Sequence, residues 1–157
     1  MKRKILLMVS IFISLFIVGY YSYKINTDNT VTEKETINEE KPKELETIKI
    51  NISGNDYTVK LENNETADSF MNILPKEYQM REANGNQKYV YLEYKLPVNE
   101  KAVKQIEAGD LMLDGEDCII LFYKSVKTSR KYTKIGHVED LPHLGNSNIT
   151  ARFYLIK

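Results

Sequence analysis

The sequence predicts a mainly β protein, a small closed barrel with two short helices, preceded by an N-terminal transmembrane helix. Three observations lead to this prediction. Short segments in which apolar and polar residues alternate recur between turn signals, as in small barrels. One continuous apolar segment, Cys118–Tyr123, has the pattern of a central strand covered on both faces. Another apolar segment, Ile5–Tyr23, carries no charge and follows a basic N-terminus.

Residues 1–23 have the features of a membrane anchor. Residues 1–4 form a basic head, and residues 5–23 approach the roughly 20 apolar residues that a helix needs to cross a bilayer core. The bulky residues 18–23 lack the small-residue pattern of a signal cleavage site. Because basic flanks remain in the cytoplasm, we expect a single-pass protein of the cell membrane with an extracytoplasmic C-terminal domain. The alternative is a domain that is secreted after signal cleavage.

Residues 24–46 are expected to be a disordered linker. Thr, Asn, Glu and Lys dominate this segment, so it has too little apolar surface to offset the entropy of ordering. The remaining residues, 47–157, suffice for one hydrophobic core and are too few for two. The sequence therefore predicts one folded domain on a tether.

Charge and cysteine content argue against several classes of protein. The 22 Lys and Arg residues balance the 22 Asp and Glu residues, so no basic excess indicates a nucleic-acid partner. Cys118 is the only cysteine, and its apolar surroundings predict a small buried hydrophobe rather than a nucleophile. His137 and His143 have no Glu between them at helical spacing, which makes them a weak metal pair. We predict no metal and no cofactor.

The first half of the domain predicts a hairpin and a helix. Apolar residues alternate along Thr47–Ile52 and again along Tyr57–Leu61, with turn residues between the two segments. Asn64 or Thr66 can cap a short helix that follows. Pro75 ends that helix because it has no N–H to donate.

Further strands follow from alternation and from turn residues. We expect strands at Tyr78–Met80, Lys88–Leu92, Leu111–Leu113, Cys118–Tyr123, Tyr132–Val138 and Ile149–Ile156. Asp114-Gly115 predicts a tight hairpin turn, which Glu116 and Asp117 can lengthen. Leu96–Gln105 is predicted to be a loop, and Glu139–Leu144 a short helix or a turn.

Three stretches of the domain together resemble the bacterial cyclophilin-like domain family. They are Leu61–Ala67 with Leu74-Pro75, then Met80–Tyr89 with Tyr91-Leu92 and Leu96-Pro97, and finally Ala108–Leu111 with Leu121–Ser125 and Tyr132–Gly136. The likeness covers nearly all of residues 47–157. It implies a compact cyclophilin-like barrel of about eight strands with short capping helices, and it leaves the activity open.

The chain departs from true cyclophilins at their catalytic motif, an Arg shortly before Phe-Met-x-Gln-Gly-Gly-Asp. The nearest match is Gln105–Asp110, and the loop before it, Pro97–Lys104, contains neither Arg nor Phe. A prolyl isomerase lowers a barrier of about 18–20 kcal/mol by binding the twisted amide better than the planar one. Arg81 and Arg130 remain as candidate cations, although a solvated surface charge is the simpler interpretation of each. The catalytic motif is absent, so its roles are not carried over to this chain and the catalytic residues stay unassigned.

Residue types suited to nucleophilic catalysis occur without a diagnostic motif. They are Ser125, Ser129, His137 and Asp140. No nucleophile elbow accompanies them, so the pattern is weak support for a hydrolase.

The tyrosines are more informative, because aromatic rings with a polar tip suit both barrel walls and ligand grooves. We predict that a ligand groove would lie beside Met80, Tyr89, Tyr91, Phe122 and Tyr132. The sequence thus predicts a membrane-anchored extracytoplasmic module that binds a peptide or a small molecule. The alternative is a divergent peptidyl-prolyl cis-trans isomerase that acts on exported proteins.

Overall fold

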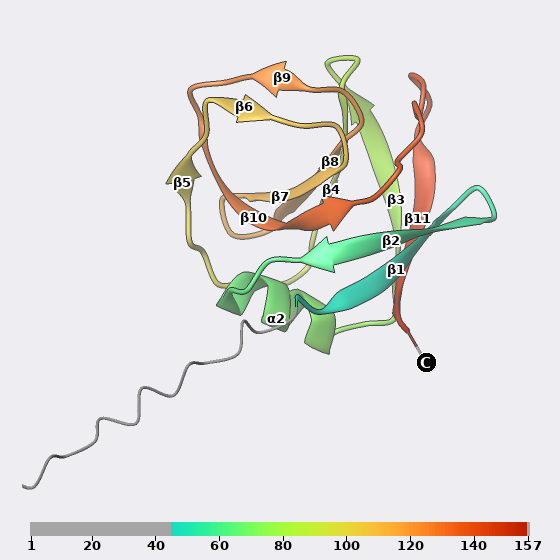
Figure 1. Ribbon diagram of the computed structural model, residues 1–157, viewed down its shortest axis with the longest axis horizontal. Helices are drawn as coiled ribbons and strands as arrows, with labels where there is room; N and C mark the ends of the chain where they lie inside the picture. The colour runs from blue at the N-terminus through green and yellow to red at the C-terminus, as the bar shows by residue number, and fades with distance from the viewer. Residues whose placement is uncertain (1–44, 157) are drawn as a thin grey trace, which may run out of the picture. The chain divides into compact units, whose positions relative to one another are not determined.

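A computed structural model describes residues 45–156 of the chain (Figure 1). The predicted basic head, the predicted transmembrane segment and almost all of the predicted linker lie outside these residues. Within residues 45–156, no helix is long and apolar enough to span a bilayer.

The predicted strands are all present as strands of the structure, with slightly different ends. In chain order, the elements are β1 (Thr47–Ile52), β2 (Asn55–Leu61), α2 (Glu65–Asn72), β3 (Lys76–Ala83), β4 (Gln87–Tyr91), β5 (Lys101–Ala102), β6 (Gln105–Ile106), β7 (Asp110–Asp114), β8 (Cys118–Phe122), β9 (Val126–Lys127), β10 (Lys131–Val138) and β11 (Ile149–Leu155). The sequence does not predict β5, β6 and β9, because two residues show no period.

Eight antiparallel strands close into a barrel in the order β2-β1-β11-β3-β4-β8-β7-β10. The ring is completed where β10 pairs with β2, through Gly136 opposite Leu61 and Val138 opposite Val59. Closure leaves none of these eight strands as a free sheet edge. The short strand β5 adds to β10, and β6 pairs with β9 as a separate two-stranded sheet (Figure 1). The predicted barrel of about eight strands is confirmed.

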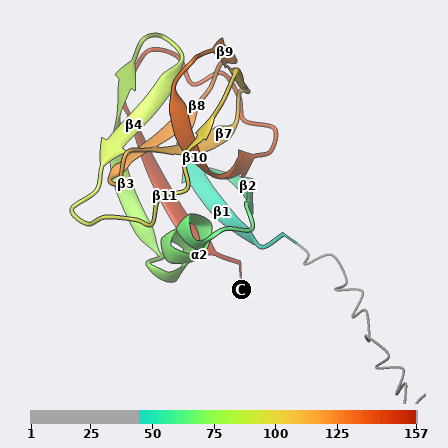
Figure 2. The ribbon, with the colours of Figure 1, turned by 90° about the vertical axis from the view of Figure 1, so that its left-hand side faces the viewer.

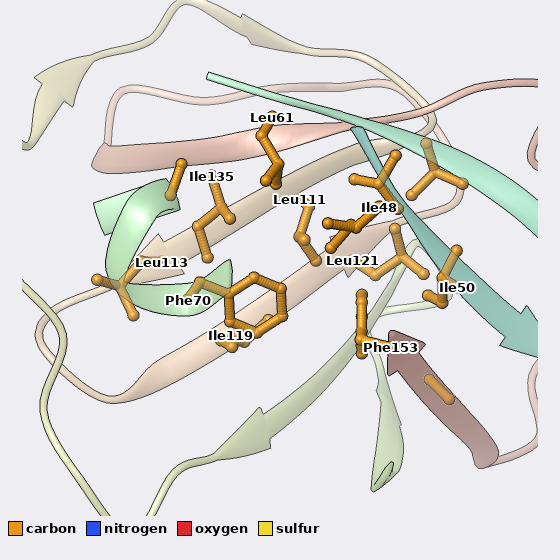
Figure 3. Packing of buried hydrophobic residues seen from close by; sticks show 14 of the residues in the cluster. Ile48, Ile50, Leu61, Phe70, Leu111, Leu113, Ile119, Leu121, Ile135 and Phe153 are labelled. Atoms are coloured by element: carbon orange, nitrogen blue, oxygen red, sulfur yellow. The ribbon is translucent and has the colours of Figure 1, made fainter. Parts of the chain in front are cut away.

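Apolar side chains from strands in which apolar and polar residues alternate fill the barrel. Ile48 and Ile50 on β1 have no exposed surface, as the alternation of this segment predicts. Phe153 on β11 meets Phe70 of α2 edge to face, with ring centroids 5.2 Å apart. Figure 3 shows these side chains converging with Leu61, Leu111, Leu113, Ile119, Leu121 and Ile135. Because side chains occupy the barrel interior, ligand sites are expected on its outer face.

The helix α2 lies at one end of the barrel (Figure 2). Of the two predicted caps, Asn64 is the one used, because its Oδ1 accepts the Ala67 N–H at 2.9 Å. The Thr66 hydroxyl instead donates to the carbonyl oxygen of Pro97 at 2.6 Å. The helix ends at Asn72, shortly before the cis peptide bond between Leu74 and Pro75.

The predicted second helix is wrong, and α2 is the single helix of residues 45–156. Residues 139–140 form a turn and residues 141–144 are irregular. Asp140 has a φ of 53°, outside the right-handed helical region, and Pro142 has no N–H for a helical hydrogen bond. Leu141 and Leu144 pack against the barrel core instead.

The β7–β8 hairpin has the longer of the two predicted turns. Asp114 lies opposite Cys118, so Gly115, Glu116 and Asp117 form a three-residue connection. Gly115 has a φ of 65°, which glycine adopts without steric cost.

Candidate functional site

The strand β8 has apolar side chains on both of its faces, as its continuous pattern predicts. Ile119 and Leu121 point into the barrel core, whereas Ile120 and Phe122 belong to a second buried cluster on the outer face. The buried members of this outer cluster are Ile106, Met112, Cys118, Ile120, Phe122 and Tyr132, with Tyr89, Val103 and Val126 packed against them. Residues of β6 and β9 are among them, so these short strands help to cover the outer face.

Four of the five predicted groove residues share this outer face. Tyr89 and Tyr91 meet edge to face with centroids 5.8 Å apart, and Phe122 meets Tyr132 in the same way at 6.0 Å. Tyr91 is 67% exposed, whereas Phe122 and Tyr132 are buried. Met80 is different, because it is fully buried in the barrel core and faces away from the other four.

A pocket of about 310 Å³ opens where the outer cluster meets β5. Its lining residues are Glu62, Asn64, Asn99, Lys101, Ala102, Val103, Met112, Tyr132 and Lys134. Met112 and Tyr132 supply buried apolar surface, and Lys101 and Lys134 supply positive charge. The volume is at the lower end of the range for small-molecule sites, about 300–1,000 Å³. This pocket, here called the Tyr132 pocket, suits one apolar group next to an anionic one.

Arg130 lies against the same tyrosine. Its guanidinium carbon is 5.5 Å from the centroid of the Tyr132 ring, within cation–π range. One guanidinium nitrogen, Nη2, donates to Asp114 Oδ2 at 2.6 Å. Burial raises the pKa of the Tyr132 hydroxyl, and the nearby Arg130 charge only partly opposes this effect. Tyr132 is therefore a neutral hydrogen-bonding group. The other candidate cation, Arg81, is exposed and lies opposite Tyr89 in the ladder between β3 and β4.

A buried carboxylate, Asp110, holds the neighbouring part of β10. Its Oδ1 lies 2.9 Å from His137 Nδ1 and 2.9 Å from Lys134 Nζ, and its Oδ2 accepts the Glu107 N–H at 2.9 Å. Burial disfavours the charged carboxylate, but these hydrogen bonds outweigh it and keep the pKa of Asp110 below its ordinary value. Lys134 is thereby fixed at the rim of the Tyr132 pocket.

The sequence does not predict the Asp110–His137 contact. It groups His137 with Asp140, the nearer carboxylate in the chain, and with two serines. In the structure, the ladder between β7 and β10 places His137 directly opposite Asp110. Ser125 donates instead to Glu107 Oε2 at 2.7 Å. Only the pairing of the strands reveals the contact between Asp110 and His137, because residues opposite each other in a ladder can be far apart in sequence.

Cys118 does not have the environment of a nucleophile. Burial is the main cause that raises the pKa of its thiol to about 11, and the nearby Asp114 and Asp117 add to it. The thiol therefore stays protonated at neutral pH, and the thiolate is the reactive form.

Lys88 is a second polar feature that the sequence does not single out. Its side chain is fully buried, and its ammonium donates to Glu82 Oε2 at 2.5 Å and to the carbonyl oxygens of Gly145 and Ser147 at 2.6 and 2.7 Å. The ammonium also lies 4.6 Å from the centroid of the Tyr123 ring. Every ammonium hydrogen thus has an acceptor, so Lys88 fixes the loop between β10 and β11.

The two histidines have separate partners. His143 accepts the Gly145 N–H through Nδ1 at 3.1 Å and packs edge to face on Tyr123, whereas His137 contacts Asp110. Across residues 45–156, no group of three or more His, Cys, Asp or Glu side chains is arranged to hold a metal ion.

No curated protein and no solved structure matches the chain. A family model described as the cyclophilin-like family matches residues 50–154, which span the barrel from β1 to β11 and cover most of the chain. The chain therefore belongs to the cyclophilin-like family.

Proposed function

We propose that the chain is a membrane-anchored module whose extracytoplasmic barrel binds a peptide or a small molecule at the Tyr132 pocket. The observation that carries this proposal is an open pocket of about 310 Å³ beside a buried aromatic cluster, on the outside of a barrel whose interior is filled. Pockets that combine apolar lining with a few fixed polar groups are the usual ligand sites of proteins.

The lining of the pocket indicates the ligand's chemistry. Met112 and Tyr132 would contact an apolar group, such as an aliphatic or prolyl side chain. Lys134 is already paired with Asp110, but Lys101 is exposed and has no ion pair within residues 45–156. Lys101 would therefore pair with a carboxylate of the ligand. An extended peptide with an apolar residue beside an acidic one fits this arrangement.

The membrane anchor is part of the same proposal and rests on the sequence. The basic residues 1–4 and the uncharged residues 5–23 support a single-pass helix with the barrel outside the cytoplasm. The linker of residues 24–46 would let the barrel reach partners near the membrane surface.

A matched pair of substitutions tests the pocket in the full chain. Ala102→Trp fills the pocket from the exposed strand β5, whereas Ala108→Trp adds the same bulk at an exposed residue that does not line it. Binding would be measured on an array of immobilised peptides that vary in apolar and acidic residues. We expect Ala102→Trp to abolish the wild-type pattern and Ala108→Trp to preserve it. An identical pattern for all three proteins would refute the pocket.

A divergent prolyl isomerase is the second candidate, and the contact between Arg130 and Tyr132 favours it. A cation beside an aromatic wall is the arrangement that could favour a twisted amide. Against it, Asp114 holds the guanidinium, and Arg130 does not line the pocket. Acceleration of prolyl isomerisation that Arg130→Gln removes would establish the enzyme. A folded chain without acceleration would leave the binding module.

A further inference from the structure

A larger hollow lies on another part of the barrel surface, over β1, β11 and the start of β3. Its volume is about 1030 Å³, and it is open to solvent. The lining residues are Asn51, Ser53, Gly54, Asp56, Pro75, Glu77, Thr150, Arg152, Tyr154, Leu155 and Ile156. None of these residues lines the Tyr132 pocket, so the two sites can be tested independently.

Opposite charges face each other in this hollow without being paired. Arg152 on β11 lies directly opposite Glu77 on β3, and both side chains line the hollow. Neither forms an ion pair within residues 45–156, although both are exposed. The hollow therefore offers one available cation and one available anion on neighbouring strands.

The other carboxylate of the hollow is already engaged. Asp56 Oδ1 accepts a hydrogen bond from Asn51 Nδ2 at 2.6 Å, and the Tyr154 hydroxyl also donates to this carboxylate. These two hydrogen bonds, that of Asn51 first, keep the pKa of Asp56 below its ordinary value. Asp56 thus has local donors, and it does not occupy the Arg152 guanidinium.

An apolar wall completes the hollow. Leu155 and Ile156 are 48% and 49% exposed, and Pro75 lines the same space, so three apolar residues share this wall. An aliphatic group of a ligand would bury part of this surface.

We propose that this hollow binds a zwitterion with an aliphatic side chain, as found in a free amino acid or a short peptide. The ligand carboxylate pairs with the Arg152 guanidinium, whose planar fork matches it in two parallel hydrogen bonds. The ligand ammonium pairs with Glu77, and its aliphatic side chain lies on Leu155 and Ile156. The volume of about 1030 Å³ accommodates several residues, so a short peptide fits as well as a single amino acid.

An ion pair between Arg152 and Glu77 would be too weak to exclude the ligand. Exposed ion pairs between side chains contribute little, because water screens them and both side chains lose freedom. A ligand whose two charges are fixed a short distance apart has less freedom to lose when it pairs with both.

The test uses the full chain in detergent micelles and isothermal titration calorimetry with four probes. L-leucine carries both charges, N-acetyl-L-leucine only the carboxylate, and L-leucinamide only the ammonium. The dipeptide Ala-Leu carries both charges at a greater separation. We expect L-leucine or Ala-Leu to bind about ten- to hundredfold more tightly than either singly charged probe. Tighter binding of L-leucine than of Ala-Leu would indicate an amino-acid site. Tighter binding of Ala-Leu would indicate a peptide site.

Matched substitutions assign the charges. Arg152→Gln and Glu77→Gln should each weaken binding of the zwitterion about ten- to hundredfold. Arg81→Gln and Glu93→Gln remove charges that are also exposed but do not line the hollow, and they should leave the affinity unchanged. Ala102→Trp, which fills the Tyr132 pocket, should also leave it unchanged.

Three outcomes would overturn the proposal. The first is no binding of L-leucine or Ala-Leu at millimolar concentration. The second is N-acetyl-L-leucine binding as tightly as L-leucine, which would mean that the site recognises an anion alone. The third is zwitterion binding that survives Arg152→Gln and Glu77→Gln but disappears in Ala102→Trp, which would assign the ligand to the Tyr132 pocket instead.

Discussion

Lys88 shows how much depends on a single buried charge. An ammonium without exposed surface is tolerated only because one carboxylate, two carbonyl oxygens and the face of an aromatic ring surround it. The carboxylate, Glu82, also accepts the Tyr123 hydroxyl at 2.9 Å and the Gly85 N–H at 2.8 Å. These contacts tie the β3–β4 hairpin to the loop before β11.

Replacing Lys88 should be costly. Lys88→Met removes the ion-pair partner of Glu82 and the donor to two carbonyl oxygens, and we expect a loss of about 3–5 kcal/mol in the free energy of unfolding, measured by urea denaturation. Lys95→Met is the matched control, because Lys95 also pairs with a carboxylate at 2.5 Å but is exposed. It should leave the stability nearly unchanged. Equal losses in the two variants would show that burial of Lys88 is not what matters.

Asp110 predicts how stability depends on pH. Hydrogen bonds from His137, Glu107 and Lys134 keep its pKa below the ordinary 3.8 despite burial. The unfolded chain therefore binds a proton at higher pH than the folded one, so the contribution of Asp110 is complete above its ordinary pKa. It is lost as the pH falls through the lowered value of the folded state.

The substitution Asp110→Asn tests this dependence. It removes the titrating group, so urea midpoints should fall less steeply below the ordinary pKa of Asp than they do for the wild type. Glu82, whose pKa is also lowered, accounts for part of the remaining slope. Asp117→Asn, at a half-buried position in the β7–β8 turn, should leave the slope as it is. If the urea midpoint of Asp110→Asn fell with pH as steeply as that of the wild type, the pH dependence could not be assigned to Asp110.

At the scale of elements, the two glycines that flank β7 are required for different reasons, one for backbone conformation alone and the other also for close packing. Gly115 and Gly109 both have positive φ, 65° and 98°. A Cβ on Gly115 would meet no atom within 4 Å, whereas one on Gly109 would lie 2.5 Å from the Val138 carbonyl oxygen and 2.8 Å from the His137 ring. The first glycine serves only the turn, and the second lets β7 approach β10.

These two glycines should therefore differ in their cost. Gly115→Ala should destabilise the protein by about 1–2 kcal/mol, the cost of a left-handed alanine. Gly109→Ala should add about 1–3 kcal/mol to that, because the new methyl group has no space. Thermal or urea unfolding of both variants measures the difference. Similar losses would mean that β7 and β10 can separate at no cost.

At the scale of the whole molecule, closure of the barrel determines where a ligand can bind. The core clusters fill the interior, so both hollows are found on the outer surface, where strands from distant parts of the chain lie side by side. The pairing of β2 with β10 closes the ring between residues that are far apart in the chain. A site built on such a barrel has a rigid floor and variable loops at its rim.

The proposed topology can be tested with the single cysteine. Cys118 is buried and its pKa is raised to about 11, so the folded wild-type chain should not react with a membrane-impermeant maleimide. Ser129→Cys places a nearly isosteric thiol at an exposed position. In intact cells, we expect labelling of the variant and none of the wild type. Labelling of Ser129→Cys only after cell lysis would place the barrel in the cytoplasm.

Local pattern in the sequence was sufficient for most of the barrel. Alternation along β1 and the continuous apolar pattern of β8 follow directly from which faces are buried, and Asn64 and Pro75 mark the limits of α2 by their own chemistry. These features depend on residues that are neighbours in the chain. The aromatic residues of the outer face were named on a different ground, because they lie on or next to the stretches that resemble the cyclophilin-like family and on strands expected to adjoin.

Only the tertiary structure decided which polar groups meet. The ladder places His137 opposite Asp110 and Arg152 opposite Glu77, and the fold brings Lys88 to a loop that follows it by more than fifty residues. Met80 faces the core rather than the tyrosines because its position in the pleat of β3 points it inward. Such contacts depend on strand register and barrel closure, which are set by the whole core, and no local pattern of residues encodes them.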